Sequence, residues 1–376
     1  MGVLSGIRII EIAGIGPAPF CGMLLADMGA EVVLVERSAA RPGDPLELGS
    51  RAIFNRGKRS VALDLKDSGA VEAVLKLVEG ADALIEGMRP GVMERLGLAP
   101  KVCLERNPRL VFGRMTGWGQ SGPLAEAAGH DINYVALSGA LWYAGNPGEA
   151  PFAPPTLVGD LGGGALYLTM GVLAGILGAR ASGRGQVVDA AIVDGSANLM
   201  NLLLAIHAAG QMPFERGRGL LDGPHWYATY RCADGAFVSV GALEAQFSRL
   251  LFEKLGLAGD PDFARPYDPR TWGRCRERLA ALFATQPRQH WTDLLEGSDA
   301  CFAPVLTPAE AAAHPHLQAR GVYAEREGVL QAAPAPRFSG TPAGEPGAVP
   351  RRGEHGRELL QKAGVAEGEI ARLLSA

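Results

Sequence analysis

The amino-acid sequence predicts an α/β protein in which a doubly wound parallel sheet is followed by a smaller α+β domain. Two observations predict this class. Hydrophobic residues make up 47% of the 376 residues and charged residues 20%, a composition that supports a large buried core. Along residues 7–117, short apolar runs alternate with helical patterns, and this order builds parallel sheets whose strands are joined by helices.

The elements of the first part follow from local patterns. Residues 7–14 (IRIIEIAG) are typical of a short buried strand, and residues 31–36 (EVVLVE) of a second one. Between them, residues 15–30 predict a helix that begins near its prolines and ends at Gly29. The alternation continues as strand, helix, strand, helix and strand at residues 60–65, 69–81, 82–87, 92–98 and 110–117. The part that follows, as far as about residue 210, is helix-rich and apolar.

The second part differs in composition and pattern. Residues 214–224 are polar and glycine-rich, which indicates a linker. Residues 227–243 predict a hairpin with Asp234–Gly235 at its turn, and two amphipathic helices follow it. The proline-rich run 331–350 predicts an extended linker before a terminal helical hairpin. We therefore expect a large domain, a small domain and a terminal segment that returns to the large domain, at residues 1–213, 225–325 and 326–376.

Charge and cysteine usage argue against several classes of protein. The net charge of −4 disfavours a nucleic-acid-binding protein, which needs many phosphate contacts. The five cysteines lie far apart without metal-binding or disulfide spacing, so we expect no metal and a reducing compartment. Residues 161–179 carry no charged side chain, but their six glycines fit a central helix buried on all sides better than a membrane span.

We also expect a cytoplasmic location. Glu11 interrupts the apolar N-terminal run, which has no cationic region ahead of it and does not predict a signal peptide. The final residues, LLSA, do not form a peroxisomal address.

A glycine pattern near the N-terminus resembles a dinucleotide-binding fingerprint but is incomplete. Gly14 and Gly16 follow the first strand, and Glu36 ends the second strand about twenty residues later. Pro19 stands where the third glycine belongs, and Pro17 and Pro19 lack the backbone N–H groups that a pyrophosphate would use. We therefore disfavour nicotinamide binding.

Two short stretches place acid/base groups in similar settings. GHDINY puts His130 next to Asp131, and LVGDLGGG puts Asp160 directly before three glycines. Singly, either His130 or Asp160 is more typical of a helix cap or a buried polar group than of catalysis. Together they are suited to face one reacting carbon from opposite sides.

Seven segments occur in a fixed order along the chain. Besides GHDINY and LVGDLGGG they are GIRIIEIAGIGPAPF, LIEGMRPGVMERLGL, RMTGWGQSGP, GRGQVVDAAIVDG and DACFAPVLTPAEAAAHPHLQARG. Taken in their order along the chain, the seven segments resemble those of the class III coenzyme A transferase family (CaiB/BaiF-like), and within it the α-methylacyl-CoA racemase branch. The resemblance implies a Rossmann-like large domain, a small domain and long linkers, with two chains interlocked as a homodimer.

The resemblance further implies racemisation of 2-methylacyl-CoA thioesters, an isomerase reaction of lipid metabolism that interconverts R and S forms at the α-carbon. His130 and Asp160 match the pair that removes and returns the α-proton through an enolate. Glu244 matches a glutamate that hydrogen-bonds this histidine and arrives from the partner chain. We expect the glycines after Asp160 to let the thioester approach, and the helix that follows to hold the enolate oxygen with its N–H groups.

Coenzyme A is part of the acyl-CoA substrate, so the resemblance implies no separate cofactor. Arg37 and Arg89 match family positions that contact the nucleotide. We add the basic cluster Arg56, Lys58 and Arg59 to the expected binding residues; a solvated basic loop is the alternative interpretation.

Two other functions stay open. A class III CoA transferase would use Asp160 as a nucleophile that forms mixed-anhydride and thioester intermediates. A catalytically silent acyl-CoA-binding protein would need no acid/base group. His130 and Glu244 favour the racemase, because acyl exchange requires neither. The sequence does not indicate which acyl chain is preferred.

Overall fold

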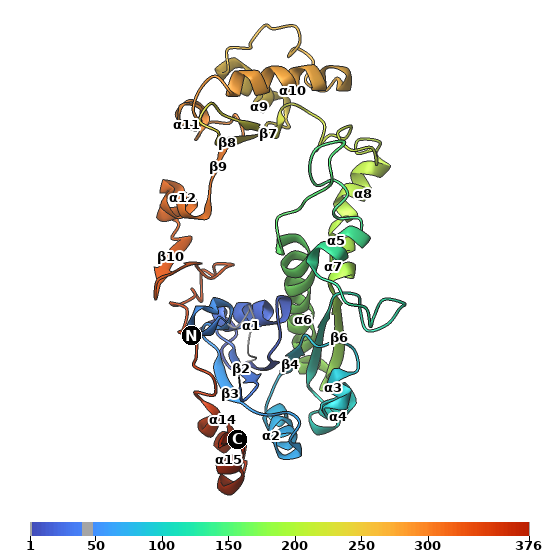
Figure 1. Ribbon diagram of the computed structural model, residues 1–376, viewed down its shortest axis with the longest axis vertical. Coiled ribbons are helices and arrows are strands. Elements are labelled where there is room, and N and C mark those ends of the chain that lie inside the picture. Colours follow the sequence, from blue (N-terminus) through green and yellow to red (C-terminus); the bar gives the residue numbers. More distant parts are fainter. Residues whose placement is uncertain (1, 40–47, 376) are drawn as a thin grey trace. The chain divides into compact units, whose positions relative to one another are not determined.

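The computed structural model describes residues 2–39 and 48–375, and the chain forms two compact units (Figure 1). Each unit has a hydrophobic core of its own. The first unit comprises Met1–Leu141, Ala153–Leu199 and Ala324–Ala376, and the second comprises Trp142–Phe152 and Met200–Tyr323.

A six-stranded parallel sheet forms the centre of the first unit, which confirms the predicted α/β fold class. The strand order is β3-β2-β1-β4-β5-β6, so the direction of winding reverses between β1 and β4. In open parallel sheets, ligands bind at the carboxyl ends of the strands beside such a reversal. The strands are β1 (Arg8–Ile12), β2 (Glu31–Glu36), β3 (Arg59–Ala62), β4 (Ala83–Glu86), β5 (Val111–Thr116) and β6 (Gln186–Ala191).

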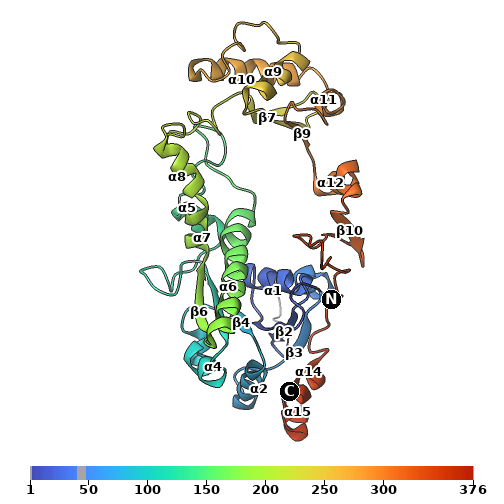
Figure 2. The ribbon, with the colours of Figure 1, turned by 180° about the vertical axis from the view of Figure 1, so that it is seen from behind.

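Alternating residues of the strands build one core on each face of the sheet. Ile10 and Leu84 pack with α2, α14 and α15, whereas Ile9 and Ile85 pack with α1 and α6. Both views show α14 and α15 side by side next to β3 (Figures 1 and 2), so the C-terminal segment completes the first core. These helices are α1 (Pro17–Asp27), α2 (Ser68–Glu79), α6 (Leu166–Ser182), α14 (Gly356–Lys362) and α15 (Glu367–Leu374).

The predicted strands and helices of the first part are present, with two additions. Strand β6 lies where only helices were expected, because its exposed residues at the sheet edge interrupt the apolar pattern of the other strands. Helix α4 (Pro100–Arg106) was not expected either. The remaining short elements of the unit are η1 (Gly49–Arg51), η2 (Ile53–Asn55), α3 (Val92–Arg95), α5 (Asp131–Leu137), the π-helix η3 (Leu157–Ala165) and α7 (Ile192–Leu199).

The second unit is built around an antiparallel sheet. The predicted hairpin is confirmed: β7 (Tyr227–Arg231) pairs with β8 (Phe237–Gly241), and Gly235 in the turn has φ +82°. Strand β9 (Phe302–Val305) extends the sheet, and Trp226 and Phe283 are fully buried in the core that covers it. The helices are α8 (Asn201–Ala208), α9 (Ala245–Lys254), α10 (Pro269–Phe283), α11 (Arg288–Leu295), α12 (Pro308–Ala313) and α13 (Pro315–Ala319).

The expected linkers agree with the structure over most of their length. Residues 214–224 and 333–350 contain neither helix nor strand. The segment without helix or strand begins at residue 333 rather than at 331, because β11 (Val329–Ala332) pairs with β10 (Tyr323–Arg326) in a two-stranded sheet.

The long apolar segment Leu157–Ser182, formed by η3 and α6, is long and apolar enough to cross a membrane by length and composition alone. Its inward side chains Leu168, Val172 and Ile176 belong to the core against the sheet. The expectation that this helix is buried on all sides is wrong for the single chain, because Leu166, Met170 and Leu177 are exposed.

A fully buried ion pair fixes the first strand to the segment that precedes β3. Lys58 Nζ lies 2.7 Å from Glu11 Oε2, and neither side chain is exposed to solvent. Lys58 also donates a hydrogen bond of 2.9 Å to the Pro19 carbonyl of α1. Gly22 has no room for a side chain, because a Cβ would stand 1.8 Å from Glu11 Oε2. The pair therefore holds β1, α1 and the Lys58 segment together.

Candidate active site

The candidate site lies at the carboxyl ends of the parallel strands, where the winding reverses. The turns after β1 and β4 lie close together, since a Cβ on Gly14 would stand 3.9 Å from the Cα of Gly87. The turn after β1 also approaches Asp160: a Cβ on Gly16 would lie 3.6 Å from Asp160 Oδ2. Gly16 itself has φ +74°, a conformation that favours glycine. The loops thus bring Asp160 over the reversal point of the sheet.

His130 stands at the N-terminus of α5, next to the same site. It is the N-cap residue, and its backbone N–H donates to Asn133 Oδ1 at 3.1 Å. The next residue, Asp131, accepts the Asp160 N–H at 2.8 Å. The structure therefore brings His130 and Asp160 together within one unit, although they are thirty positions apart in the chain.

Asp131 connects the two elements that carry these residues. Asp131 Oδ1 accepts the Asp160 N–H at 2.8 Å, and Oδ2 accepts the Thr156 N–H at 3.3 Å. Gly159 leaves space for this contact, since a Cβ there would stand 2.4 Å from Asp131 Oδ1. The start of η3 is therefore held against the start of α5 by one carboxylate.

The expected helix after Asp160 begins earlier than the sequence indicated. Thr156 is the N-cap of η3, in a left-handed conformation with φ +62°, and Asp160 lies inside the helix rather than at its cap. The first π-type hydrogen bond joins the Leu161 N–H to the Thr156 carbonyl at 3.0 Å. The N–H groups of Thr156 and Asp160 are bonded to Asp131. The N–H groups of residues 157–159 also precede the first helical hydrogen bond, and these are available to a ligand oxygen.

The glycines that follow Asp160 serve packing. A Cβ on Gly163 would stand 2.5 Å from Ser196 Oγ of α7, and a Cβ on Gly164 would stand 3.0 Å from Ile192 Cγ1. These two glycines therefore allow η3 to lie close to α7, and the expectation that they open a path for the thioester is not needed to explain them.

Burial raises the pKa of Asp160 from its ordinary value of 3.8 to about 6. The negative charge of Asp131 raises the pKa further, and His130 opposes both effects. A carboxyl group with a pKa near 6 is mostly ionised at neutral pH yet is readily protonated, which suits a residue that both takes and returns a proton.

Glu244 belongs to the second unit, whereas His130 and Asp160 belong to the first. It is the N-cap residue of α9 and is exposed. Within the described residues its carboxylate has no hydrogen-bond partner or counterion. Burial raises the pKa of the Cys301 thiol, and the negative charge of Glu244 raises that pKa further. The carboxylate is therefore accessible for a contact from outside its own unit.

The basic residues divide into two groups. Arg37 follows β2 and Arg89 follows β4, and both are exposed at the carboxyl ends of their strands. Arg56 and Lys58 are buried instead, because Arg56 pairs with Asp27 at 2.6 Å and Lys58 with Glu11.

Arg59 also has internal partners. It forms ion pairs with Glu31 and Glu358 at 3.0 and 2.5 Å. The expectation that Arg56 and Lys58 bind nucleotide therefore needs correction, because their charges are buried and paired inside the protein and give no free charge to a phosphate. The Arg59 side chain is 20% exposed and its partner Glu358 53%, so nucleotide binding by Arg59 stays a prediction.

Three residues near the site were given no role by the sequence analysis. Asp131 and Tyr134 lie in the same GHDINY motif as His130, and Trp118 lies in the loop after β5. The helical spacing of His130 and Tyr134 was the available signal, since residues four apart share one face of a helix. Contacts between loops, such as that of Asp131 with Asp160, leave no such signal in the sequence.

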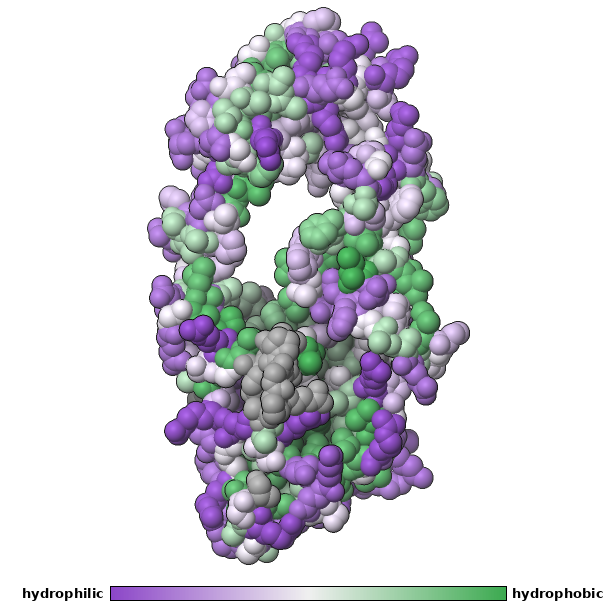
Figure 3. Space-filling model, viewed as in Figure 1, coloured by the Kyte–Doolittle hydropathy of each residue, from purple (hydrophilic) through white to green (hydrophobic). Residues whose placement is uncertain are grey.

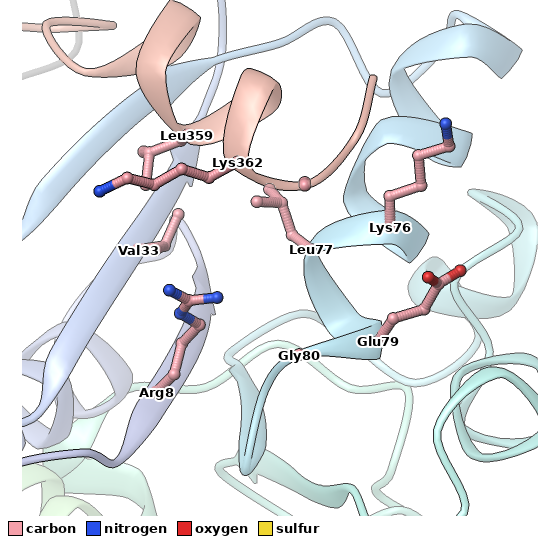
Figure 4. Close-up of a pocket in the computed structure, with 9 residues that line it drawn as sticks. Arg8, Val33, Lys76, Leu77, Glu79, Gly80, Leu359 and Lys362 are labelled. Carbon is pink, nitrogen blue, oxygen red and sulfur yellow. The ribbon is translucent and has the colours of Figure 1, made fainter. Parts of the chain in front are cut away.

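A pocket of about 290 Å³ lies at the opposite, amino edge of the sheet, between β1, α2 and α14 (Figure 4). Figure 4 shows Lys76 and Lys362 on opposite sides of it. Its cations have partners already: Arg8 pairs with Glu31 at 2.8 Å and Lys362 with Glu358 at 2.7 Å. None of the candidate acid/base residues lines this pocket. Among the described residues no cluster of three or more potential metal ligands occurs.

The sheet order and the candidate acid/base groups at its carboxyl edge define an α/β protein with a candidate ligand site at the reversal of the sheet. The chain belongs to CoA-transferase family III, whose model matches residues 4–356, and this confirms the family predicted from the sequence.

Curated relatives cover nearly the whole chain. It is 42% identical over 379 residues to an alpha-methylacyl-CoA racemase of Mus musculus, covering 99% of this chain and 96% of that protein. The racemase of Homo sapiens is 40% identical, with 99% and 96% covered. An acetyl-CoA:oxalate CoA-transferase of Acetobacter aceti is 30% identical, with 98% and 97% covered. Both reactions therefore occur among the similar proteins.

The fold also matches solved structures. A CaiB/BaiF family protein from Brucella suis superposes with a TM-score of 0.80 at 26% identity, covering 96% of this chain and 99% of that one. The protein Rv3272 of Mycobacterium tuberculosis gives a TM-score of 0.76 at 25% identity, with 95% and 98% covered.

Proposed function

We propose that this protein racemises 2-methylacyl-CoA thioesters by moving the α-proton from one face of the carbon to the other. The observation that carries the proposal is the meeting of His130 and Asp160 at the reversal of the sheet, where Asp160 has a pKa near 6. Similarity of 40–42% to two alpha-methylacyl-CoA racemases over nearly the full chain supports the substrate class.

The chemistry needs two groups because racemisation is symmetric. For one enantiomer, ionised Asp160 takes the α-proton, and protonated His130 then delivers a proton to the opposite face of the enolate. For the other enantiomer, neutral His130 takes the proton and protonated Asp160 returns one. Each turnover leaves the two groups in the opposite protonation states, and exchange with solvent restores them.

The enolate oxygen also needs hydrogen-bond donors. The N–H groups of residues 157–159, at the start of η3, are the nearest backbone donors to Asp160 that precede the first helical hydrogen bond. Donors fixed in a helix stabilise developing negative charge without reorganisation. We assign the oxyanion contact to this turn.

We further propose that the active protein is a homodimer in which Glu244 of the partner subunit supports His130. The exposed apolar face of α6 supports this, since Leu166, Met170 and Leu177 are 53%, 60% and 69% exposed. Figure 3 shows apolar residues at the surface among hydrophilic ones. Exposed apolar side chains that gather on one helix of a folded chain are typical of a protein–protein interface.

Sedimentation of the purified chain tests the dimer. We expect a species of twice the 39.4 kDa chain mass at working concentration. A single chain that is fully active would overturn both the dimer and the shared site.

A cytoplasmic location accords with the cysteines. All five are free in the structure, and four are buried. Free thiols persist in reducing compartments, so we keep this location as part of the proposal.

A CoA transferase is the second candidate, because the family includes transferases and Asp160 could act as a nucleophile. It would form an anhydride at Asp160 and would need an acceptor acid. The racemase accounts better for His130, which a transferase does not require.

Proton exchange in deuterated buffer separates these functions. We expect the protein alone to incorporate deuterium at the α-carbon of both enantiomers of a 2-methylacyl-CoA, with loss of optical purity. His130→Ala and Asp160→Asn should each lose racemisation by roughly a hundredfold or more. Each should keep α-exchange with retention for only one enantiomer, and the two variants should keep opposite ones.

Other outcomes have clear meanings. If turnover requires an acceptor acid and survives His130→Ala, the protein is a transferase. If neither exchange nor transfer occurs, the protein only binds acyl-CoA. Symmetric exchange near the parent rate in both variants would remove His130 and Asp160 from the mechanism.

Recognition of the nucleotide gives a second prediction. Arg37→Ala and Arg89→Ala should raise KM for acyl-CoA about tenfold with kcat nearly unchanged, because a phosphate contact stabilises ground and transition states alike. Arg109→Ala is a matched control, since Arg109 is exposed just before β5 at the other edge of the sheet.

The buried lysine should behave differently. Lys58→Met should lower the free energy of unfolding by about 3–5 kcal/mol, because it leaves Glu11 buried without a counterion, and should leave KM of the folded protein unchanged. Steady-state kinetics and denaturant unfolding measure the two effects. A rise in KM for Lys58→Met, or none for Arg37→Ala and Arg89→Ala, would reverse the assignment.

A further inference from the structure

The Tyr134 side chain packs against Gly129, the residue that precedes His130. It follows His130 by four positions on α5, is only 8% exposed, and its hydroxyl donates a hydrogen bond to the Gly129 carbonyl. The segment 122–130 contains no helix or strand. Two hydrogen bonds that involve a side chain hold its end in place, this one and the bond from the His130 N–H to Asn133 Oδ1.

The space around the Tyr134 ring is filled on two sides. A Cβ on Gly129 would stand 2.7 Å from Tyr134 Cε1, and a Cβ on Gly117 would stand 2.0 Å from Tyr134 Cζ. The Trp118 ring meets the Tyr134 ring edge to face, with centroids 4.7 Å apart at 83°. The ring thus connects the carboxyl end of β5 to the residue before His130, and only glycine fits at both contacts.

The electrostatic surroundings keep the hydroxyl in its donor form. Burial raises the pKa of Tyr134, the charge of Asp160 raises it further, and Arg89 opposes them. The phenol is therefore neutral at working pH and able to donate.

We propose that Tyr134 is a positioning residue that aims His130 at the α-carbon by holding the Gly129 carbonyl. This inference rests on the proposed function and adds a residue to it. Tyr134 acts through the backbone of Gly129 and has no role on the Asp160 side of the reaction. Its loss should therefore weaken one half of a two-base reaction and spare the other.

Tyr134→Phe tests this, because it keeps the ring and its packing and removes only the hydroxyl. Racemisation should fall about tenfold or more, since a small misplacement of a catalytic group costs that much. In deuterated buffer, α-exchange of the enantiomer that His130 deprotonates should fall by the same factor. Exchange of the enantiomer that Asp160 deprotonates, identified with His130→Ala, should stay near the parent rate, with KM unchanged.

Tyr230→Phe is the matched control. Tyr230 is also a buried tyrosine whose hydroxyl donates to a backbone carbonyl, that of His225 at 2.5 Å, in the core of the second unit. It should lose similar stability without any bias between enantiomers. Gly129→Ala provides a second route, because its Cβ has no room against the Tyr134 ring and should displace the same segment.

The outcomes separate the inference from the function on which it rests. A one-sided loss in both Tyr134→Phe and Gly129→Ala supports the positioning role. Equal loss for both enantiomers, or no loss, in Tyr134→Phe overturns it while the parent still racemises. Absence of α-exchange in the parent protein overturns the proposed function and the inference together.

Discussion

The carboxylate of Asp131 is the contact on which the site depends. It accepts the backbone N–H groups of Asp160 and Thr156, and so holds the first turn of η3 against the first turn of α5. Two acid/base residues from separate segments thereby reach one place above the reversal of the sheet. The same carboxylate adds negative charge beside a half-buried Asp160, so one contact both positions Asp160 and adds to the rise in pKa that burial causes.

This arrangement lowers stability at neutral pH. Because the folded-state pKa of Asp160 is raised, the folded protein binds that proton more tightly than the unfolded chain does. The stabilisation that the folded protein gains from this tighter proton binding is fully present below the ordinary pKa of 3.8 and is lost as the pH rises through about 6. The left-handed Thr156 adds backbone strain at the same turn. Sites that need a perturbed acid or base commonly carry such a cost.

Much of the fold could be predicted, because the parallel strands follow a local alternation that the sequence displays. Strand β6 escaped prediction since its edge position leaves its first residues exposed. At the site, the GHDINY and LVGDLGGG motifs identified His130 and Asp160, but the roles of neighbours depended on contacts between distant segments. The basic run around Lys58 illustrates this: its pairing with Glu11, 47 positions earlier, turns an apparent anion site into part of the core. Gly163 and Gly164 likewise are required by their close contacts with α7, which the sequence did not indicate.

Titration of the Asp160 carboxyl tests the central claim most directly. Its carbon-13 chemical shift, assigned with the Asp160→Asn protein, should show a midpoint near 6 in the parent chain. Asp131→Asn keeps one oxygen that can accept the shorter bond, from the Asp160 N–H, but removes the charge, so the midpoint should move to lower pH. A parent midpoint near the ordinary value of 3.8, or a midpoint unchanged by Asp131→Asn, would contradict the account.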